Sequence, residues 1–243
     1  MGIPITTATA TDEQDRAATV AVLPVGSMEQ HGPHLPLTTD TAIACAIAQR
    51  LAETYTLMLL APITISCSHE HSPLRGTVSI SATTLYAVVA DIQRSLAASG
   101  IHRLLIVNGH GGNYVLSNYV QEANAGHPPR VALFPLAHDW RRARVDAGLE
   151  TTGSQDWHGG ELETSILLHT APGLVRPGIA NDDSVPEDGL PHLLMLGMPA
   201  YTPTGVVGKP SQATPAKGAA ILDSLVLSAK APLTLLTAPK ETP

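Results

Sequence analysis

The sequence predicts an α/β protein with three layers, α/β/α, built around a mostly parallel central sheet. Short runs rich in Val, Leu and Ile alternate with longer segments whose apolar residues recur at helical spacing, through about the first 170 residues. The short runs are continuously apolar, which is typical of parallel strands that helices cover on both faces. This alternation predicts repeated right-handed crossover units.

Four apolar runs are the expected strands, and the end of the chain is a further candidate. They span residues 18–26, 56–66, 103–109 and 130–137. Helices are expected at residues 41–55, 83–100, 113–126, 160–173 and 213–233. Thr83 or Thr84 is a suitable N-cap for the second helix, and Gly100 is a suitable C-cap.

The region 174–215 is rich in Pro, Gly, Asp and Ser, and we expect a loop-rich excursion there. No internal repeat or low-complexity linker divides the chain. Residues 1–243 are therefore expected to form a single domain.

Composition excludes several classes of partner. The chain has 14 Lys+Arg against 21 Asp+Glu and no basic stripe, so a nucleic-acid partner is not expected. Arg141, Arg142 and Arg144 form the densest basic group, which reads as a solvated face. No run of about 18 apolar residues predicts a membrane span. Two cysteines, Cys45 and Cys67, do not make a disulfide framework, and a reducing cytoplasm is the simplest location.

Ligand-type side chains gather in three glycine-rich segments near predicted strand ends. MEQHGPHLPLTTD at 28–40 follows the first strand, NGHGGN at 108–113 ends the third, and DWHGGELET at 156–164 precedes a helix. Because ligands in open α/β sheets bind at the carboxyl ends of the strands, we expect these segments to meet at one rim. The expected metal ligands are Glu29, His31, Asp40, His110 and Glu161.

Carboxylates and imidazoles of this kind suit Zn²⁺ or Mn²⁺. Glu29 and His31 are two residues apart in an extended loop and point to the same side. Asp40 can bridge two ions about 3.5–4 Å apart, and a metal-bridging hydroxide would then be a nucleophile at neutral pH. Glu163 starts a helix and would point away from Glu161, so we expect it to stabilise the helix end or support a ligand.

Other histidines and other chemistries fit less well. The isolated histidines are expected to be structural, and His34 is expected to belong to the loop rather than to the ligand set; the isolated ones are His102, His127, His138, His169 and His192. No G-x-S-x-G elbow, phosphate-binding loop or dinucleotide fingerprint is present. Cys67 in SCSHEH is a conceivable thiol nucleophile, but it would leave the carboxylates unexplained.

These segments resemble the creatininase (creatinine amidohydrolase) family. The similar pieces run in the family order from about residue 20 to 220: VLPVGSMEQHGPHLPLTTD, SCSHEHSPLRGT, NGHGGN, HGGELETS and GVVGKPSQATPAKG. The resemblance implies a creatininase-like α/β fold, two divalent ions per chain (Zn, Mn or Fe), a homo-oligomer that in the family is often a hexamer, and hydrolysis of C–N bonds. The family includes creatininases, a formamidopyrimidine-type deformylase and the peptidase of mycofactocin maturation.

The resemblance also implies residue roles. Glu29 and His31 would each bind one ion, Asp40 would bridge both, and His110 would join the ion of Glu29. Creatininase proper has a further carboxylate at the position of Gly112, which cannot ligate, so the resemblance transfers that role to Glu161. His158 would pass a proton to the leaving nitrogen. Ser68, Gly111 and Trp157 are the substrate-binding candidates.

Departures from creatininase proper bear on the substrate. Gly111 replaces an aromatic residue, and Ser154 and Gln155 replace a Trp-Asp pair, so creatinine is not the expected substrate. The sequence thus predicts a dinuclear-metal-dependent hydrolase that cleaves an amide, formamide or cyclic amide bond of a small molecule. The alternatives are a metallopeptidase that trims a short peptide and a metal-binding module without turnover.

Overall fold

A four-stranded, all-parallel sheet forms the centre of the protein. The computed structural model describes residues 5–238 of the chain. The strands are β1 (Val20–Val25), β2 (Met58–Leu59), β3 (Arg103–Asn108) and β4 (Val131–Phe134), in the order β2-β1-β3-β4. Val20 pairs with Arg103, and Leu104 pairs with Val131. The predicted α/β class and parallel sheet are confirmed.

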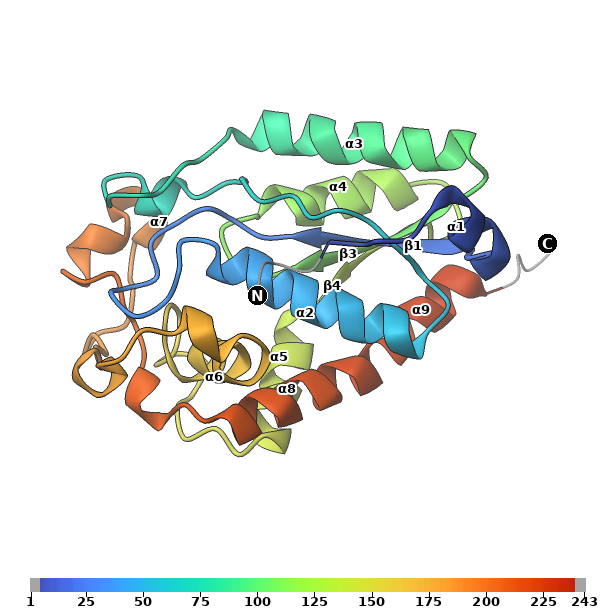
Figure 1. The fold of residues 1–243 in the computed structure, drawn as a ribbon. Helices are drawn as coiled ribbons and strands as arrows, with labels where there is room; N and C mark the ends of the chain where they lie inside the picture. Colours follow the sequence, from blue (N-terminus) through green and yellow to red (C-terminus); the bar gives the residue numbers. More distant parts are fainter. Residues whose placement is uncertain (1–4, 239–243) are drawn as a thin grey trace.

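Helices cover both faces of this sheet (Figure 1). One face carries α3 (Ala82–Ala98) and α4 (Val115–Asn124). The other carries α2 (Thr39–Thr54), α5 (Ala137–Asp146), α6 (Glu161–Thr170) and α8 (Pro215–Ser228). Successive residues of each strand face opposite cores, so that Val22 packs with α2 while Leu23 packs with α3. Two buried faces explain why the strands are continuously apolar.

The ends of the helices follow local rules. The Ser81 hydroxyl, rather than Thr83 or Thr84, caps α3 by accepting a hydrogen bond from the Thr84 N–H. Helix α2 begins at Thr39, two residues earlier than predicted, which places Asp40 in its first turn. Helix α6 ends at Thr170, and Pro172 follows shortly after.

Three elements differ from the sequence prediction. Helix α1 (Ala10–Arg16) was not predicted, because it buries no residue and is set by a local capping box. Helix α5 was not predicted either: the expected strand 130–137 overlaps it only at Ala137. Only Asp139 and Ala143 are buried in this helix, so it lacks an apolar stripe. Near the end of the described residues, Lys230–Thr237 form helix α9 and not a strand.

The region 174–215 is loop-rich, as predicted, and contains only short helical turns. These turns are η3 (Ile179–Asn181), α7 (Leu193–Leu196), η4 (Met198–Ala200) and η5 (Pro210–Gln212), and η2 (Pro172–Leu174) directly precedes them. A further turn, η1 (His69–His71), is distant in sequence but contacts α7 and η4. Strand β2 is much shorter than the predicted 56–66. The chain beyond it still follows β1, through a hydrogen bond from the Ile63 N–H to the Pro24 carbonyl.

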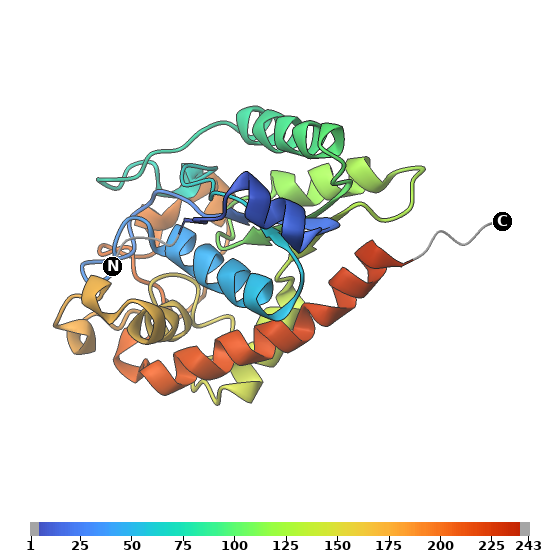
Figure 2. The same ribbon diagram turned by 45° about the vertical axis from the view of Figure 1, so that its right-hand side comes forward.

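Residues Pro215–Thr237 form one helical stretch that is long and apolar enough to cross a membrane, by length and composition only. The sequence reading did not find this run. Figure 2 shows α8 and α9 in line along one side of the molecule. The apolar side of α8, including Ile221, Leu222 and Leu225, is buried in the core with α2 and α6. Packing in the core accounts for the apolar residues on this side of α8, whereas Leu227 and Leu235 are exposed.

Candidate metal centre

Five of the predicted site residues meet at the carboxyl-terminal edge of the sheet. Glu29 and His31 lie on the loop after β1, Asp40 lies in the first turn of α2, His110 follows β3, and His158 precedes α6. Each is at most 6% exposed. The chain thus buries carboxylates and imidazoles together, which is stable only when they pair with one another or hold a cation.

Asp40 lies at the middle of this cluster. Its Oδ1 is 3.0 Å from Nε2 of His31, and its Oδ2 is 3.0 Å from Nδ1 of His110. The Ser27 hydroxyl donates a hydrogen bond of 2.7 Å to Oδ2, which orients the carboxylate. The two carboxylate oxygens of Asp40 therefore point to two different groups of ligand-type atoms.

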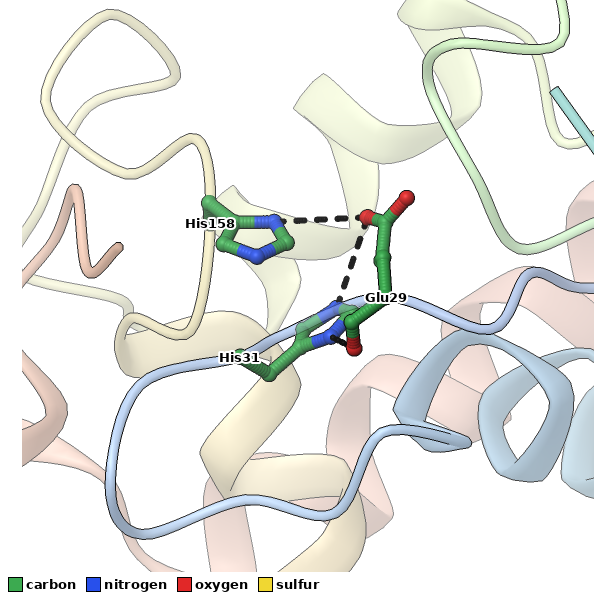
Figure 3. A group of neighbouring side chains, drawn as sticks. All are labelled: Glu29, His31 and His158. Atoms are coloured by element: carbon green, nitrogen blue, oxygen red, sulfur yellow. Dashed lines mark hydrogen bonds and ion pairs between the residues drawn. The ribbon is translucent and has the colours of Figure 1, made fainter. Parts of the chain in front are cut away.

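Two groups of potential ligand atoms share Asp40. One consists of Glu29, Asp40 and His110, and the other of His31, Asp40 and Glu163; in each, the atoms lie within 4.8 Å of one another. A third group joins Glu29 and His31 to His158 (Figure 3). A shared carboxylate between two three-ligand groups is the arrangement that two-metal hydrolases use.

The carboxylate of Glu29 is buried without hydrogen-bond donors among the described residues. Both of its carboxylate oxygens are buried without a hydrogen bond of acceptable geometry from any residue in 5–238. Its Oε1 lies 3.2 Å from Nδ1 of His110 and 3.7 Å from Nδ1 of His158. A buried carboxylate without a partner is strongly unfavourable, and a divalent ion would remove that cost. The orphaned oxygens thus fit a bound metal.

The charges of the cluster support the same conclusion. Burial raises the pKa of Glu29, with the neighbouring Asp40 carboxylate adding to the effect, and burial raises the pKa of Glu163 to about 7. Burial lowers the pKa of His31, but the Asp40 carboxylate outweighs it and raises that pKa to about 9. Within residues 5–238, no Lys or Arg forms an ion pair with these carboxylates. Divalent cations would balance these charges.

Glu161 does not reach this cluster, which corrects the sequence prediction. It is the first residue of α6, and its Oε1 accepts a hydrogen bond of 2.6 Å from the Lys217 ammonium. Its Oε2 accepts from the Thr151 hydroxyl at 2.6 Å and from the Thr151 N–H at 2.9 Å. Its carboxylate is already neutralised by a lysine and by neutral donors.

Glu163 occupies the place predicted for Glu161. Its Oε2 lies 3.9 Å from Nε2 of His31 and accepts a hydrogen bond of 2.6 Å from the Gly159 N–H. Two helix residues separated by one position point roughly 200° apart, so only one of the pair can face the site. The HGGELE motif indicates a helix start with two carboxylates but does not say which side of the helix faces the metal cluster.

His158 is held on both sides of its ring. Its backbone pairs with Val207 of the GVVG segment, and its Nε2 donates to the main-chain carbonyl of Gln30. The ring centroid lies 4.0 Å from that of His31 and 4.3 Å from that of His71. Nδ1 of His158 faces the carboxylate of Glu29 (Figure 3). The ring can therefore exchange a proton at Nδ1.

The sequence reading missed His71. It is 3% exposed, and its Nε2 lies 3.6 Å from Oε1 of Glu29. Its segment, SCSHEH, was considered for Cys67 as a nucleophile and for Ser68 as a substrate-binding residue, but not for its histidines. Burial raises the pKa of the Cys67 thiol, which disfavours a thiolate nucleophile, while the Cys67 carbonyl accepts a hydrogen bond of 2.7 Å from His110 Nε2. The glycine at 112 leaves room for Glu70, whose Oε1 would lie 2.0 Å from a Cβ there.

A cleft of about 790 Å³ opens beside the cluster. Its lining includes His110, His158 and Glu163 from the cluster, together with Gly111 and Trp157. Trp157 is 53% exposed, so an aromatic face is available at this cleft. Two of the three substrate-binding candidates thus line the cleft.

Ser68 and His34 lie elsewhere. Ser68 is fully buried, and its N–H donates to the Ser79 hydroxyl at 2.8 Å. His34 contacts the Thr164 hydroxyl through Nε2 at 3.1 Å and Asp182 through Nδ1 at 3.4 Å. His34 thus connects the loop after β1 to α6 and to the 174–215 region, and it lies outside the three ligand groups.

The chain is similar in sequence to known proteins. Residues 5–231 match the family model described as "Creatininase: Creatinine amidohydrolase". The chain belongs to the creatininase family. It is 38% identical over 218 residues to a "Mycofactocin precursor peptide peptidase" of Mycobacterium ulcerans (strain Agy99), with 84% of this chain and 80% of that protein covered.

The chain is also similar to proteins that are named creatininase or creatinine amidohydrolase. The chain is 29% identical over 226 residues to "Creatinine amidohydrolase" of Pseudomonas putida, with 85% of each chain covered. The solved structure "Creatininase Mn" superposes with a TM-score of 0.78 at 25% identity and covers 96% of this chain and 98% of its own. The family fold therefore extends over nearly the whole chain.

Proposed function

We propose that this creatininase-family protein is a metal-dependent amidohydrolase that holds two divalent ions and cleaves a C–N bond in a substrate larger than creatinine, a short peptide above all. One observation carries the proposal: the two carboxylate oxygens of Asp40 reach His31 and His110 separately, between two groups of ligand-type atoms that are buried except for the partly buried Glu163. Glu29 and His110 would hold one ion with Asp40, and His31 and Glu163 would hold the other.

The chemistry divides between the ions and the side chains. Bound ions would polarise the amide carbonyl and make a water molecule acidic enough to attack at neutral pH. His158 can accept a proton at Nδ1 and would pass it to the departing nitrogen, because an amide nitrogen leaves poorly unless it is protonated. The buried loop after β1 holds Glu29 and His31 in place before any ion binds, since Pro33 restricts its backbone and Gly32 allows the positive φ of +69° that its turn requires.

Two observations support a peptide substrate. The cleft beside the cluster, at about 790 Å³, is far larger than creatinine requires and lies within the range of sites for drug-sized ligands. The relative with 38% identity is named for cleavage of a precursor peptide. A small cyclic or formyl amide is the second candidate, favoured by the 29% identity to a creatinine amidohydrolase. Zn²⁺, Mn²⁺ and Fe²⁺ all suit these ligands, and a solved relative is titled "Creatininase Mn".

The test combines metal content with turnover. Elemental mass spectrometry of the purified protein, after incubation with Zn²⁺ or Mn²⁺, should give about two ions per chain. Mass spectrometry of products should then show cleavage of short peptides, with formamides, lactams and creatinine in parallel reactions. Metal binding without hydrolysis of any of these amides would favour a metal-binding module. Fewer than about half an ion per chain would contradict the two-metal proposal itself.

A further inference from the structure

The side-chain amide of Gln30 has one possible orientation. Its Oε1 receives the Gly32 N–H at 3.0 Å, and its Nε2 faces the Gly205 carbonyl at 3.5 Å. A backbone N–H can only donate and a carbonyl can only accept, so the oxygen and nitrogen of this amide cannot be exchanged. Gly205, with a φ of +86°, makes room for the amide, because a Cβ there would lie 1.7 Å from Oε1 of Gln30.

This amide determines where His71 carries its proton. Nε2 of Gln30 lies 2.9 Å from Nδ1 of His71. An amide nitrogen has no lone pair to offer, so Nδ1 of His71 must be the acceptor and must be unprotonated. The ring proton of His71 therefore sits on Nε2, which faces Oε1 of Glu29 at 3.6 Å.

The main chain of the same residue determines the proton of His158. The carbonyl of Gln30 contacts Nε2 of His158, and a carbonyl only accepts, so the proton is on Nε2. The neutral ring then presents the lone pair of Nδ1, which lies 3.7 Å from Oε1 of Glu29. Both histidines carry the proton on Nε2, but His71 turns Nε2 toward Glu29, whereas His158 turns Nδ1 toward it.

We propose that Gln30 is a positioning residue that makes His71 present an N–H, and His158 a lone pair, to the same corner of the metal centre. The inference rests on the proposed function for its catalytic meaning. An imidazole Nε2 that carries a proton cannot coordinate an ion, so Gln30 keeps His71 out of the ligand set. His71 then directs its N–H toward Oε1 of Glu29, while the lone pair of His158 remains free to accept a proton.

Gln30→Glu tests this role with almost no change of shape. A carboxylate only accepts, so it would draw the His71 proton to Nδ1 and leave Nε2 bare against Glu29. His158 should not respond, because its partner is the main-chain carbonyl of residue 30. Gln121→Glu, at an exposed position of α4, makes the same change of charge far from the site and serves as the control.

Nitrogen NMR of ¹⁵N-histidine-labelled, zinc-loaded protein reads the tautomers directly. The wild-type spectrum should show Nε2–H for both His71 and His158, with the signals assigned by their loss in His71→Asn and His158→Asn. In Gln30→Glu only His71 should change to Nδ1–H. With metal content unchanged, kcat should fall about 10–100-fold while KM moves little, as for other residues that orient ligands. The control should match the wild type.

The wild-type spectrum does not depend on how any variant folds. Nδ1–H on wild-type His71 would overturn the inference, and so would a Gln30→Glu spectrum in which His71 keeps Nε2–H. The tautomers can also be read without turnover. A protein with the expected tautomers that hydrolyses no amide would therefore contradict the proposed function and leave the hydrogen-bond assignment standing.

Discussion

The two glutamates at the start of α6, Glu161 and Glu163, differ in the groups that surround their carboxylates. Glu161 faces Lys217 and Thr151, which provide an ammonium, a hydroxyl and an N–H to its two oxygens. Glu163 faces His31 and Asp40, and its one hydrogen-bond donor in the described residues is the Gly159 N–H. The first carboxylate is complete without a cation, whereas the second lies beside another carboxylate.

Their pKa values move in opposite directions. Burial alone would raise the pKa of Glu161, but hydrogen bonds from Lys217 and Thr151 lower it below its usual value. Burial raises the pKa of Glu163 to about 7, and the nearby Asp40 carboxylate adds to the effect of burial. Burial alone therefore does not identify a carboxylate as a metal ligand. A carboxylate removed from water is a candidate ligand when the protein provides too few hydrogen-bond donors or cations for it.

The largest expected effect comes from Asp40→Asn, because Asp40 serves both groups of ligands. Both ions should be lost, and turnover should fall by about 10³-fold or more, since metal binding supplies both the polarised carbonyl and the acidic water. Elemental mass spectrometry and kcat/KM for the best peptide would measure this. Two ions per chain in this variant would refute the bridging role of Asp40.

His158→Ala should reduce turnover by about 10²–10⁴-fold, the range for loss of a general acid or base. The ions should stay bound, because Asp40 still lies between His31 and His110. Metal content and single-turnover rates on the same preparation distinguish the possibilities. An empty metal centre in this variant would make His158 a ligand, in line with its place beside Glu29 and His31.

Glu163→Gln tests the metal side of α6. It removes one charged ligand from the group with His31 and Asp40, so metal content should drop from about two ions to about one. Turnover should fall by about 10²-fold or more. The fold should be retained, because this carboxylate pairs with no Lys or Arg in the described residues and Asp40 still accompanies His31. Unchanged metal content would show that Glu163 does not bind an ion.

Glu161→Gln is the matched substitution on the other side and should have the smallest effect on activity. Metal content should stay at the wild-type value, and kcat/KM should change little. The free energy of unfolding should fall by roughly 2–3 kcal/mol, since Lys217 loses a buried charged partner. For a chain of this size that corresponds to a Tm about 4–12 °C lower. Loss of an ion here, with stability unchanged, would reverse the comparison.

A chelator sharpens the contrast by acting on one region only. Removal of the ions should lower the Tm of the wild type and of Glu161→Gln, because ions that bind only the folded state stabilise it. Asp40→Asn should show almost no change with chelator, since its centre is already empty. Differential scanning calorimetry of the three proteins with and without chelator makes the measurement. An equal chelator effect in all three would place the bound ions outside this cluster.

The sequence by itself determined most of the framework. Continuous apolar runs at 20–25 and 103–108 are strands because both sheet faces are covered, and this pattern can be read locally. The stiff loop from Glu29 to Asp40 and the NGH turn could be placed at strand ends in the same way. Helix α5 could not be predicted as a helix, because it buries too few apolar side chains to show a period.

The tertiary structure alone decided which groups meet. The roles of Glu161 and Glu163 depend on Lys217, which is 56 residues from Glu161 in sequence, and on the angle at which α6 packs beside α8. The tautomers of His71 and His158 depend on the side-chain amide and the main-chain carbonyl of Gln30, and the amide faces Gly205, which is 175 residues away in sequence. Periodicity carries information about neighbours along the chain, whereas hydrogen bonds and charge balance in a buried cluster arise only when distant segments pack together.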